Sequence, residues 1–473
     1  MKTRRISIAH ARVDHHNVQL QWSMDSKPPI PKPVSDDQVQ ELAQLFSSSA
    51  VHGDKKKFHN ACRRLSELMP DEIKDELGRD ADMGRRRPLD LIVRDVGLSQ
   101  LPWEAVVVKR DRLRSIRLDD AYCVLRRIEG GVPQGAPPTA GYALFYDETM
   151  EGACRFAREV GTPADPAQVA PVVIPLENAA GDRCAAEFAS SGIVHIAGYG
   201  DNGLAKDTFK IHRAQPHPDG REAMPPLIAA RDVCGGGHGS VFGDPRLSRT
   251  PAVVFADCCH SGETCLTCCG QVGSLASAVI RRGTRLFVGN IGEVPTFPAG
   301  VGGEDVRGSE CFYHLWCALF DNAGENGGAA PGGFHAIGDC IYAARMLTAA
   351  DNLPAAYSCV VYAAEGVSPG QSLEDLLGLD VPKNVRIGGE ERLAIAHAME
   401  GMGKPAWWQT ALDYALAPAA LLLAVLLVVL FRPQAWVDAT GRDAGNWIIG
   451  MLAVAAGLAV SVIRDVGRGG RGG

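Results

Sequence analysis

The sequence lacks a strongly basic stripe: the formal net charge of its 473 residues is −7, with charges of both signs spread along the chain. A surface that binds nucleic acid needs clustered lysines and arginines that neutralise several phosphates. The short basic runs at residues 55–57 and 85–87 are typical of solvated helix and loop faces. We therefore expect no nucleic-acid partner.

The N-terminus also lacks the apolar core of a secretory signal peptide, because residues 1–9 are basic with scattered apolar side chains. Most of the 14 cysteines lie inside apolar runs, where a cysteine acts as a small core residue. These features indicate a reducing, cytosolic compartment for the main domain rather than a disulfide framework. No repeat with a period of 20–50 residues is present, which argues against a helical-repeat array.

Residues 35–366 alternate between short apolar runs and helical patterns. This alternation predicts an α/β fold with a mainly parallel sheet, preceded by a helical front part at residues 35–84. Ser35 and the two aspartates after it are typical of a helix N-terminus. Residues 1–34 are polar and end in prolines, so we expect an edge strand near residues 18–22 and then an extended linker. Residues 367–410 are expected to form a second linker.

The C-terminal segment, residues 411–473, has a different composition. Residues 415–431 and 447–463 are uncharged apolar runs near the shortest length that spans a bilayer. Tryptophans and Tyr414 flank the runs, as interfacial anchors do, and the tail after residue 463 carries excess positive charge. We expect a transmembrane hairpin with both ends, and the main domain, in the cytoplasm; two buried core helices are the alternative.

The most informative segment is PAVVFADCCHSG at residues 251–262, where an apolar run ends abruptly in polar residues. Such a run is typical of a buried strand. In open α/β sheets, ligands bind outside the carboxyl ends of the strands. Cys258 and Cys259 are therefore expected at the edge of a cleft, on a rigid element.

This segment resembles the nucleophile motif of caspase-like cysteine peptidases, in which the second cysteine, here Cys259, attacks the substrate. Further blocks resemble the CHAT family of caspase-like proteins in the same order: LPWE at 101–104, GTRLFVG at 283–289, FHAIGD at 334–339 and AYSCVVY at 356–362. The resemblance implies a caspase-like α/β/α sandwich over most of residues 35–366. It also implies a protein or peptide substrate, with no cofactor and no metal; the oligomeric state stays open.

A second apolar run, in GIVHIAGYGDNG at residues 192–203, leads into a glycine-flanked turn. The corresponding turn of caspase-like peptidases reads Gly-His-Gly, and its histidine is the general base. Tyr199 occupies that position here, and a tyrosine with a pKa of about 10 is a poor proton acceptor at neutral pH. The backbone N–H groups of Gly200 and Cys259 are the expected oxyanion donors.

Two other histidines are candidates for the missing base. His195 lies on the same run as Tyr199 and is expected to be either a core residue or a substitute base. His238 stands in a Gly-His-Gly sequence, but its loop leads to the opposite end of the cysteine strand. Asp257 is expected either to line a specificity pocket for a basic residue, as in related peptidases, or to be a capping or ion-paired carboxylate.

Two alternative readings of the cysteines remain open. Cys259 is either a nucleophile or an inert structural cysteine. A metal site would draw on a cluster of thiols and one imidazole within twelve residues, but no second ligand pair is visible elsewhere in the sequence. The members of this cluster are Cys258, Cys259, His260, Cys265, Cys268 and Cys269. The sequence thus predicts either a membrane-anchored cysteine endopeptidase with an impaired base or an inactive pseudopeptidase that binds a partner.

Overall fold

The computed structural model describes most of the chain up to residue 401. The described residues are 3–12, 18–81, 86–94, 96–110, 115–128, 141–148, 150–160, 171–178, 181–198, 200–201, 210–211, 228–229, 250–262, 265–266, 272–273, 275–292, 310–321, 334–377, 385 and 387–401. The two apolar runs near the C-terminus lie outside them. Among the described helices, none is long and apolar enough to cross a membrane.

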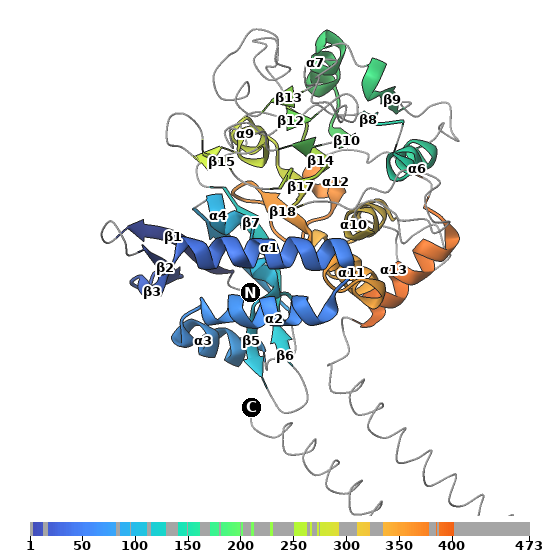
Figure 1. Cartoon of the computed structure of the whole chain (residues 1–473). Coiled ribbons are helices and arrows are strands. Elements are labelled where there is room, and N and C mark those ends of the chain that lie inside the picture. The colour runs from blue at the N-terminus through green and yellow to red at the C-terminus, as the bar shows by residue number, and fades with distance from the viewer. Residues whose placement is uncertain are drawn as a thin grey trace, which may run out of the picture. The chain divides into compact units, whose positions relative to one another are not determined.

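A single 11-stranded sheet forms the centre of the described chain (Figure 1), in the order β3-β2-β1-β4-β7-β18-β17-β14-β10-β8-β9. Its strands are β1 Arg4–Arg12, β2 Val18–Met24, β3 Ile30–Val34, β4 Arg87–Val93, β7 Tyr122–Arg127, β8 Tyr142–Tyr146, β9 Val172–Pro175, β10 Ile193–Ala197, β14 Val253–Asp257, β17 Leu286–Asn290 and β18 Cys359–Ala363. Small sheets are formed by β5 Val107–Arg110 with β6 Ser115–Arg117, by β11 Gly200–Asp201, β12 Lys210–Ile211 and β13 Ile228–Ala229, and by β15 Cys265–Leu266 with β16 Val272–Gly273.

Apart from β2 and β3, which pair antiparallel at one edge, the large sheet consists of two parallel blocks that run in opposite directions. From β1 through β4 and β7 to β18 the pairs are parallel, and from β17 through β14, β10 and β8 to β9 they are parallel again. The blocks meet at β17 and β18, which pair antiparallel. The fold is therefore mixed α/β with a large, mostly parallel sheet, as the alternating pattern predicts.

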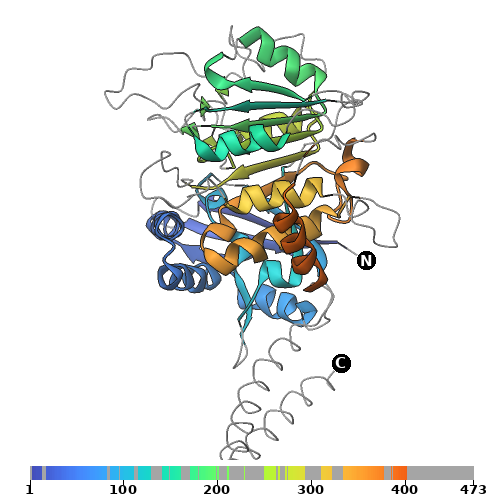
Figure 2. The same ribbon diagram turned by 90° about the vertical axis from the view of Figure 1, so that its right-hand side faces the viewer.

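Helices cover both faces of the block that contains β14. The α-helices are α1 Asp36–His52, α2 Lys55–Glu67, α3 Asp71–Ala81, α4 Val96–Ser99, α5 Leu118–Ala121, α6 Glu151–Val160, α7 Gly181–Ser190, α9 Leu275–Arg281, α10 Glu310–Phe320, α11 Ile337–Asp351, α12 Leu373–Leu377 and α13 Gly389–Gly401; the 3-10 helices are η1 Trp103–Ala105, η2 Leu176–Asn178 and η3 Ala355–Tyr357. Figure 1 shows α7 and α9 on one side of the strands and α6 and α10 on the other. In the perpendicular view, α6, α10 and α11 lie in front of the sheet (Figure 2).

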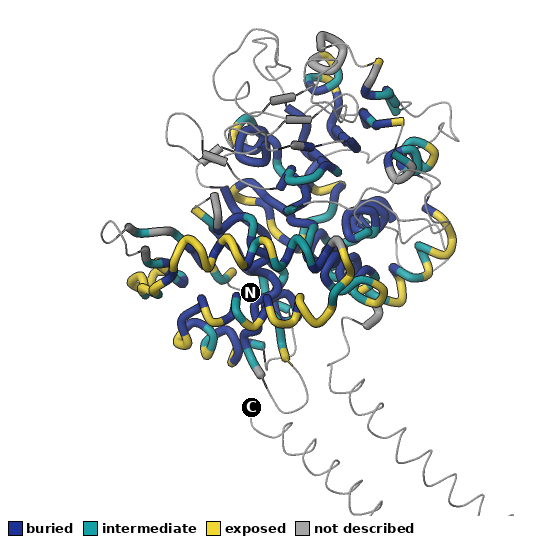
Figure 3. The backbone as a smooth tube through the Cα atoms, in the orientation of Figure 1, coloured by how far each residue is buried: buried dark blue, intermediate teal, exposed yellow. Residues whose placement is uncertain are grey.

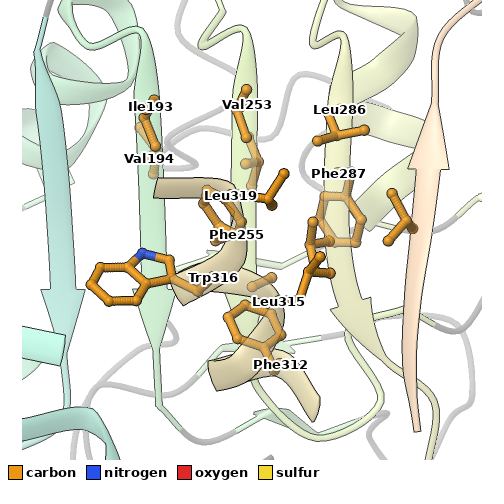
Figure 4. Close-up of a cluster of buried hydrophobic side chains, with 14 of the residues drawn as sticks. Ile193, Val194, Val253, Phe255, Leu286, Phe287, Phe312, Leu315, Trp316 and Leu319 are labelled. Atoms are coloured by element: carbon orange, nitrogen blue, oxygen red, sulfur yellow. The ribbon is translucent and has the colours of Figure 1, made fainter. Parts of the chain in front are cut away.

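The burial of each helix follows its sequence. Helix α10 is buried along almost its whole length, whereas α1 and α2 each expose a polar side (Figure 3). Phe312, Leu315 and Trp316 of α10 pack over the apolar side chains of β10, β14 and β17 (Figure 4). An apolar strand that is covered on both faces is fixed by packing, so its carboxyl end is a rigid support.

Two expected linkers belong to the folded body instead. The segment before Ser35 forms β1, β2 and β3, and β1 pairs with β4 inside the large sheet. Its prolines at positions 31 and 33 lie on β3, an edge strand, where a missing N–H is tolerated. Residues 367–401 include α12 and α13, whose Leu373 and Ile395 are buried in the main core. At both places the burial of apolar side chains stabilises strands or helices, although the local composition is polar.

The start of the helical front part agrees with the sequence. The Ser35 hydroxyl accepts a hydrogen bond from the N–H of Gln38, and the Gln38 side chain accepts one from the N–H of Ser35. This reciprocal cap satisfies two donors at the beginning of α1. The helix ends at Gly53, whose φ of 61° is a conformation that glycine adopts without strain.

Candidate functional site

The site is a sharp turn that follows β14. The strand ends at Asp257, and the chain then reverses through Cys258, Cys259 and His260. The N–H of Ser261 donates to the carbonyl of Cys258 at 3.3 Å, and His260 has a φ of 59°, in the left-handed region. A non-glycine residue in this region stores backbone strain that the surrounding structure must hold in place.

Ser261 and Gly262 fasten this turn to the neighbouring strand β17. The Ser261 hydroxyl donates to the carbonyl of Ala256 at 2.6 Å and accepts from the N–H of Asn290 at 2.9 Å. The N–H of Gly262 donates to the carbonyl of Asn290 at 2.7 Å. A methyl group on Gly262 would lie 2.5 Å from a methyl carbon of Val360, so only glycine fits without a shift. The serine and glycine of the motif therefore hold the turn in place.

The two adjacent cysteines lie in different environments. The Cys258 side chain is buried, and its thiol points to the carbonyl of Ile196 at 3.8 Å. Burial raises the pKa of the Cys258 thiol well above its ordinary value. Cys259 is partly exposed on the same turn. Because the thiolate is the nucleophile, the second cysteine is the one suited to react with a substrate.

Asp257 is partly buried at the carboxyl end of β14. Its Oδ1 accepts a hydrogen bond from the Asn290 side chain at 2.9 Å. Burial raises the pKa of the Asp257 carboxyl to about 7, although the bond from Asn290 opposes the shift. This arrangement agrees with a hydrogen-bonded carboxylate and contains no ion pair in the described contacts. A carboxyl with a strongly raised pKa at the end of a parallel strand is also typical of functional sites.

The end of β10 lies beside the cysteine turn. The N–H of Gly198 donates to the carbonyl of Asp257 at 3.1 Å, which joins the two strand ends. A methyl group on Gly198 would lie 2.5 Å from a side-chain carbon of Leu176. Gly200 is buried at the start of β11. Tyr199, the expected position of the base, lies outside the described residues, as does His238.

His195 is buried in the core, which favours its role as a core residue over that of a substitute base. Its side chain is fully buried on β10, with Nδ1 2.8 Å from the hydroxyl of Tyr142. The rings of Phe156 and Phe255 lie 4.4 and 5.7 Å from its own, measured between centroids. Burial lowers the pKa of His195 to about 3, so the imidazole is neutral at physiological pH. A histidine enclosed in this way cannot exchange a proton with a thiol at the strand end.

Only some members of the possible metal-binding cluster are among the described residues. Cys268 and Cys269 lie outside the described residues, and the side chain of Cys265 is not described. Across the described part of the chain, no three His, Cys, Asp or Glu side chains are placed to hold a metal ion. Within the described part of the cluster, Cys258 is turned into the core and away from the partly exposed Cys259.

The residues that support the turn were not evident from the sequence. Asn290 binds Asp257 through its side chain and Ser261 through its backbone. Its position at the end of the predicted strand at residues 283–289 is the signal that identifies it, since adjacent parallel strands end at the same edge. Tyr362 also supports the turn, because its hydroxyl donates to the carbonyl of Gly262 at 2.9 Å.

Comparison with solved structures finds two crystal structures of the Saccharomyces cerevisiae separase-securin complex. They match with TM-scores of 0.46 and 0.45 and sequence identities of 8% and 7%. Each match covers 76% of this chain, which spans only 30% of the length of the chains it matches. No protein-family model matches the sequence, and a search of curated proteins found no match.

Proposed function

We propose that the chain is a membrane-anchored, caspase-like cysteine endopeptidase of the CHAT type, with Cys259 as the nucleophile. The observation that carries the proposal is the contrast between the two cysteines on one rigid turn. Cys258 is buried with a raised pKa, whereas Cys259 is partly exposed beside the end of β10. A thiol on a fixed support, beside the end of β10, is the arrangement that attack on a peptide carbonyl needs.

The reaction needs three groups. Cys259 supplies the thiolate that attacks the carbonyl carbon, and its N–H together with that of Gly200 would bind the oxyanion. A base must take the thiol proton and return it to the leaving amine. Tyr199 stands at the position of that base, and general acid–base catalysis contributes about 10²–10⁴-fold, so we expect weak peptidase activity. Asp257 would lie beside the substrate residue before the cleaved bond.

A pseudopeptidase is the second candidate, and the imidazole of His195 favours it. Of the two histidines that could replace the missing base, His195 is buried in the core with a pKa of about 3, and His238 lies outside the described residues. In that case the carboxyl edge of β10 and β14 would bind a protein or peptide partner without cleaving it. The C-terminal hairpin would then serve as an anchor or as the effector segment at the membrane.

The nucleophile is tested by limited labelling with iodoacetamide and mass spectrometry. We expect Cys259 to be labelled and Cys258 to be protected. Tyr199→His should raise cleavage of a peptide with a basic residue before the cleaved bond by about 10²-fold. Cys259→Ala should abolish that gain, and Cys258→Ala is the matched control that should keep it. If neither wild type nor Tyr199→His cleaves a diverse peptide library, the pseudopeptidase remains.

The membrane anchor is tested separately. If residues 415–431 and 447–463 span the bilayer, the full chain should stay in the membrane fraction after carbonate extraction. A reporter fused after Gly473 should lie in the cytoplasm, together with the main domain. Extraction of the full chain into the soluble fraction would contradict the anchor without bearing on the thiol.

A further inference from the structure

A pocket of about 200 Å³ lies directly beside the cysteine turn. One wall is formed by His260, which follows Cys259, together with Ile291 and Gly292. The N–H of His260 donates to the carbonyl of Gly292 at 2.9 Å, so the turn and this wall form one unit. Because consecutive Cα atoms are about 3.8 Å apart, the wall begins one residue from the proposed nucleophile.

The lining also includes the side of α1 that carries Ala43 and Ser47. The floor is a pair of aromatic rings, Phe58 and Tyr357, stacked at 5.4 Å. The Tyr357 hydroxyl donates to Asp119 at 3.1 Å and Arg117 lies over the ring at 5.6 Å, which fixes the floor from behind. A floor held in this way keeps the pocket open rather than letting it collapse.

The lining determines what the pocket accepts. Of the described residues that line it, none is Asp, Glu, Lys or Arg; His260 is the one imidazole, and the neutral polar groups are those of residues such as Gln100 and Ser358. A charged group placed there would lose its water without gaining a counter-ion in contact with it. The volume is below that of a site for a drug-sized ligand, and a cavity of about 150 Å³ is known to hold one benzene ring.

We propose that this pocket receives one uncharged aromatic or large aliphatic side chain of a peptide bound at Cys259. The inference rests on the proposed function, because it takes the Cys259 turn as the place where the peptide lies. It makes α1 part of the substrate-recognition surface, with Ser47 as a specificity-determining residue. Ser47 is well placed for this, because its Oγ lies 3.6 Å from the position that a methyl group on Gly292 would take.

The test measures the rate at which small electrophiles label Cys259 in the full chain. Four chloroacetamides differ only in the tail on nitrogen: benzyl, isobutyl, hydroxyethyl and carboxymethyl. Each rate is read by mass spectrometry and divided by the rate with free glutathione, and iodoacetamide, which has no tail, gives the baseline. We expect the benzyl and isobutyl reagents to label Cys259 about 10-fold faster than the hydroxyethyl and carboxymethyl reagents, because their tails are buried in the pocket.

Two matched variants test whether the preference for apolar tails arises in the pocket. Ser47→Leu fills the pocket and should remove the preference for apolar tails when each of its rates is divided by its own iodoacetamide rate. Ser48→Leu makes the same change at the next residue of α1, outside the lining, and should keep the preference. If Ser47→Leu does not fold, as judged by its thermal transition, Ala43→Leu fills the same wall.

The possible results separate this inference from the proposed function. Labelling of Cys259 by iodoacetamide without a preference among the tails would overturn the pocket and leave the nucleophile standing. A preference for the carboxymethyl tail, or one that survives both pocket-filling variants, would also overturn the pocket. No iodoacetamide labelling of Cys259 in wild type would overturn the proposed function and this inference together.

Discussion

The two blocks of the central sheet are stabilised by different chemistry. Around β10, β14 and β17 the core is apolar, with Trp316 and Phe255 fully buried. At β7, the fully buried Arg126 forms a two-point ion pair with Glu104 at 2.9 and 3.0 Å. The strands that lead to the cysteine turn thus rest mainly on apolar packing, with His195 as a buried titratable group among them, whereas β7 is held by a buried ion pair.

The buried charges form a connected group. Arg126 also donates to the carbonyls of Ser99 and Leu101, and Arg345 lies 3.6 Å from Asp119. Burial alone raises the pKa of Glu104, but the Arg126 guanidinium outweighs it, so the pKa lies below its usual value. Glu104 is the glutamate of the LPWE segment, which therefore has a structural role here. Such a group fixes geometry more than it adds net stability.

The largest effect is expected from breaking this ion pair. Glu104→Gln leaves the Arg126 charge buried without its partner, so the free energy of unfolding should fall by about 3–5 kcal/mol. Chemical denaturation of the full chain measures the change. The double variant Glu104→Leu with Arg126→Met should lose less than Glu104→Gln, since no charge is left unpaired. A loss below 1 kcal/mol for Glu104→Gln would mean that water reaches Arg126.

The block around β10 and β14 should lose stability at low pH, because His195 is buried in it. The folded pKa of His195 is about 3, below its unfolded value of 6.5, so the native state binds fewer protons between these values. Stability from this group is therefore present above pH 6.5 and is lost as the pH falls. At pH 4.5 the loss is about 2–3 kcal/mol. His195→Gln should reduce the acid loss of stability by that amount, whereas His397→Gln, at an exposed position, should not.

A smaller effect is expected where the turn meets β17. Gly262→Ala forces a methyl group against Val360, so the free energy of unfolding should fall by about 1–3 kcal/mol. The iodoacetamide rate at Cys259 should change as well, because the turn must shift. Adding Val360→Ala removes the closest contact and should restore part of the rate, since backbone atoms of Gly289 and Asn290 still lie 3.1 and 3.2 Å from the added methyl group. A rate unchanged in Gly262→Ala would show that the turn is not held by this contact.

The smallest changes in stability are expected for substitutions of the two neighbouring cysteines, and they should differ between the two positions. Cys258→Ser places a hydroxyl in an apolar site and should cost about 1–3 kcal/mol. Cys259→Ser replaces a partly exposed thiol and should stay within about 0.5 kcal/mol of wild type. Thermal unfolding of the two variants gives the comparison. Equal losses would mean that both thiols are packed in the core, which would contradict the nucleophile assignment.

The sequence predicted the strands whose apolar runs end abruptly, and the structure confirms β10, β14 and the capped start of α1. Before Ser35 it predicted a strand near residues 18–22 but not β1, because β1 pairs with β4, which lies far away in the chain. The role of His195 was left open for a similar reason. Period and spacing place it on a strand, but only the packing of α6 and α10 shows that it is enclosed.

The candidate site was predictable in part. The six-residue motif identified Cys259, yet the functions of Ser261 and Gly262 emerge only from their contacts with β17. The pocket beside the turn could not be predicted, since it is built from α1, α2, η3 and the ends of β14 and β17. Segments that are distant in sequence line this pocket together, so no local sequence pattern predicts it.

Strand β18 lies at the centre of the sheet although it is the last strand among the described residues. The block from β1 to β7 and the block from β8 to β17 are joined only when this strand enters between β7 and β17. Contacts between segments so far apart in sequence form slowly. The same strand brings Tyr362 to Gly262, and Ser358 just before it brings its carbonyl to the N–H of Ile291. During synthesis the thiol turn therefore reaches its final shape after nearly all of the folded body has left the ribosome, which delays any activity until the fold is complete.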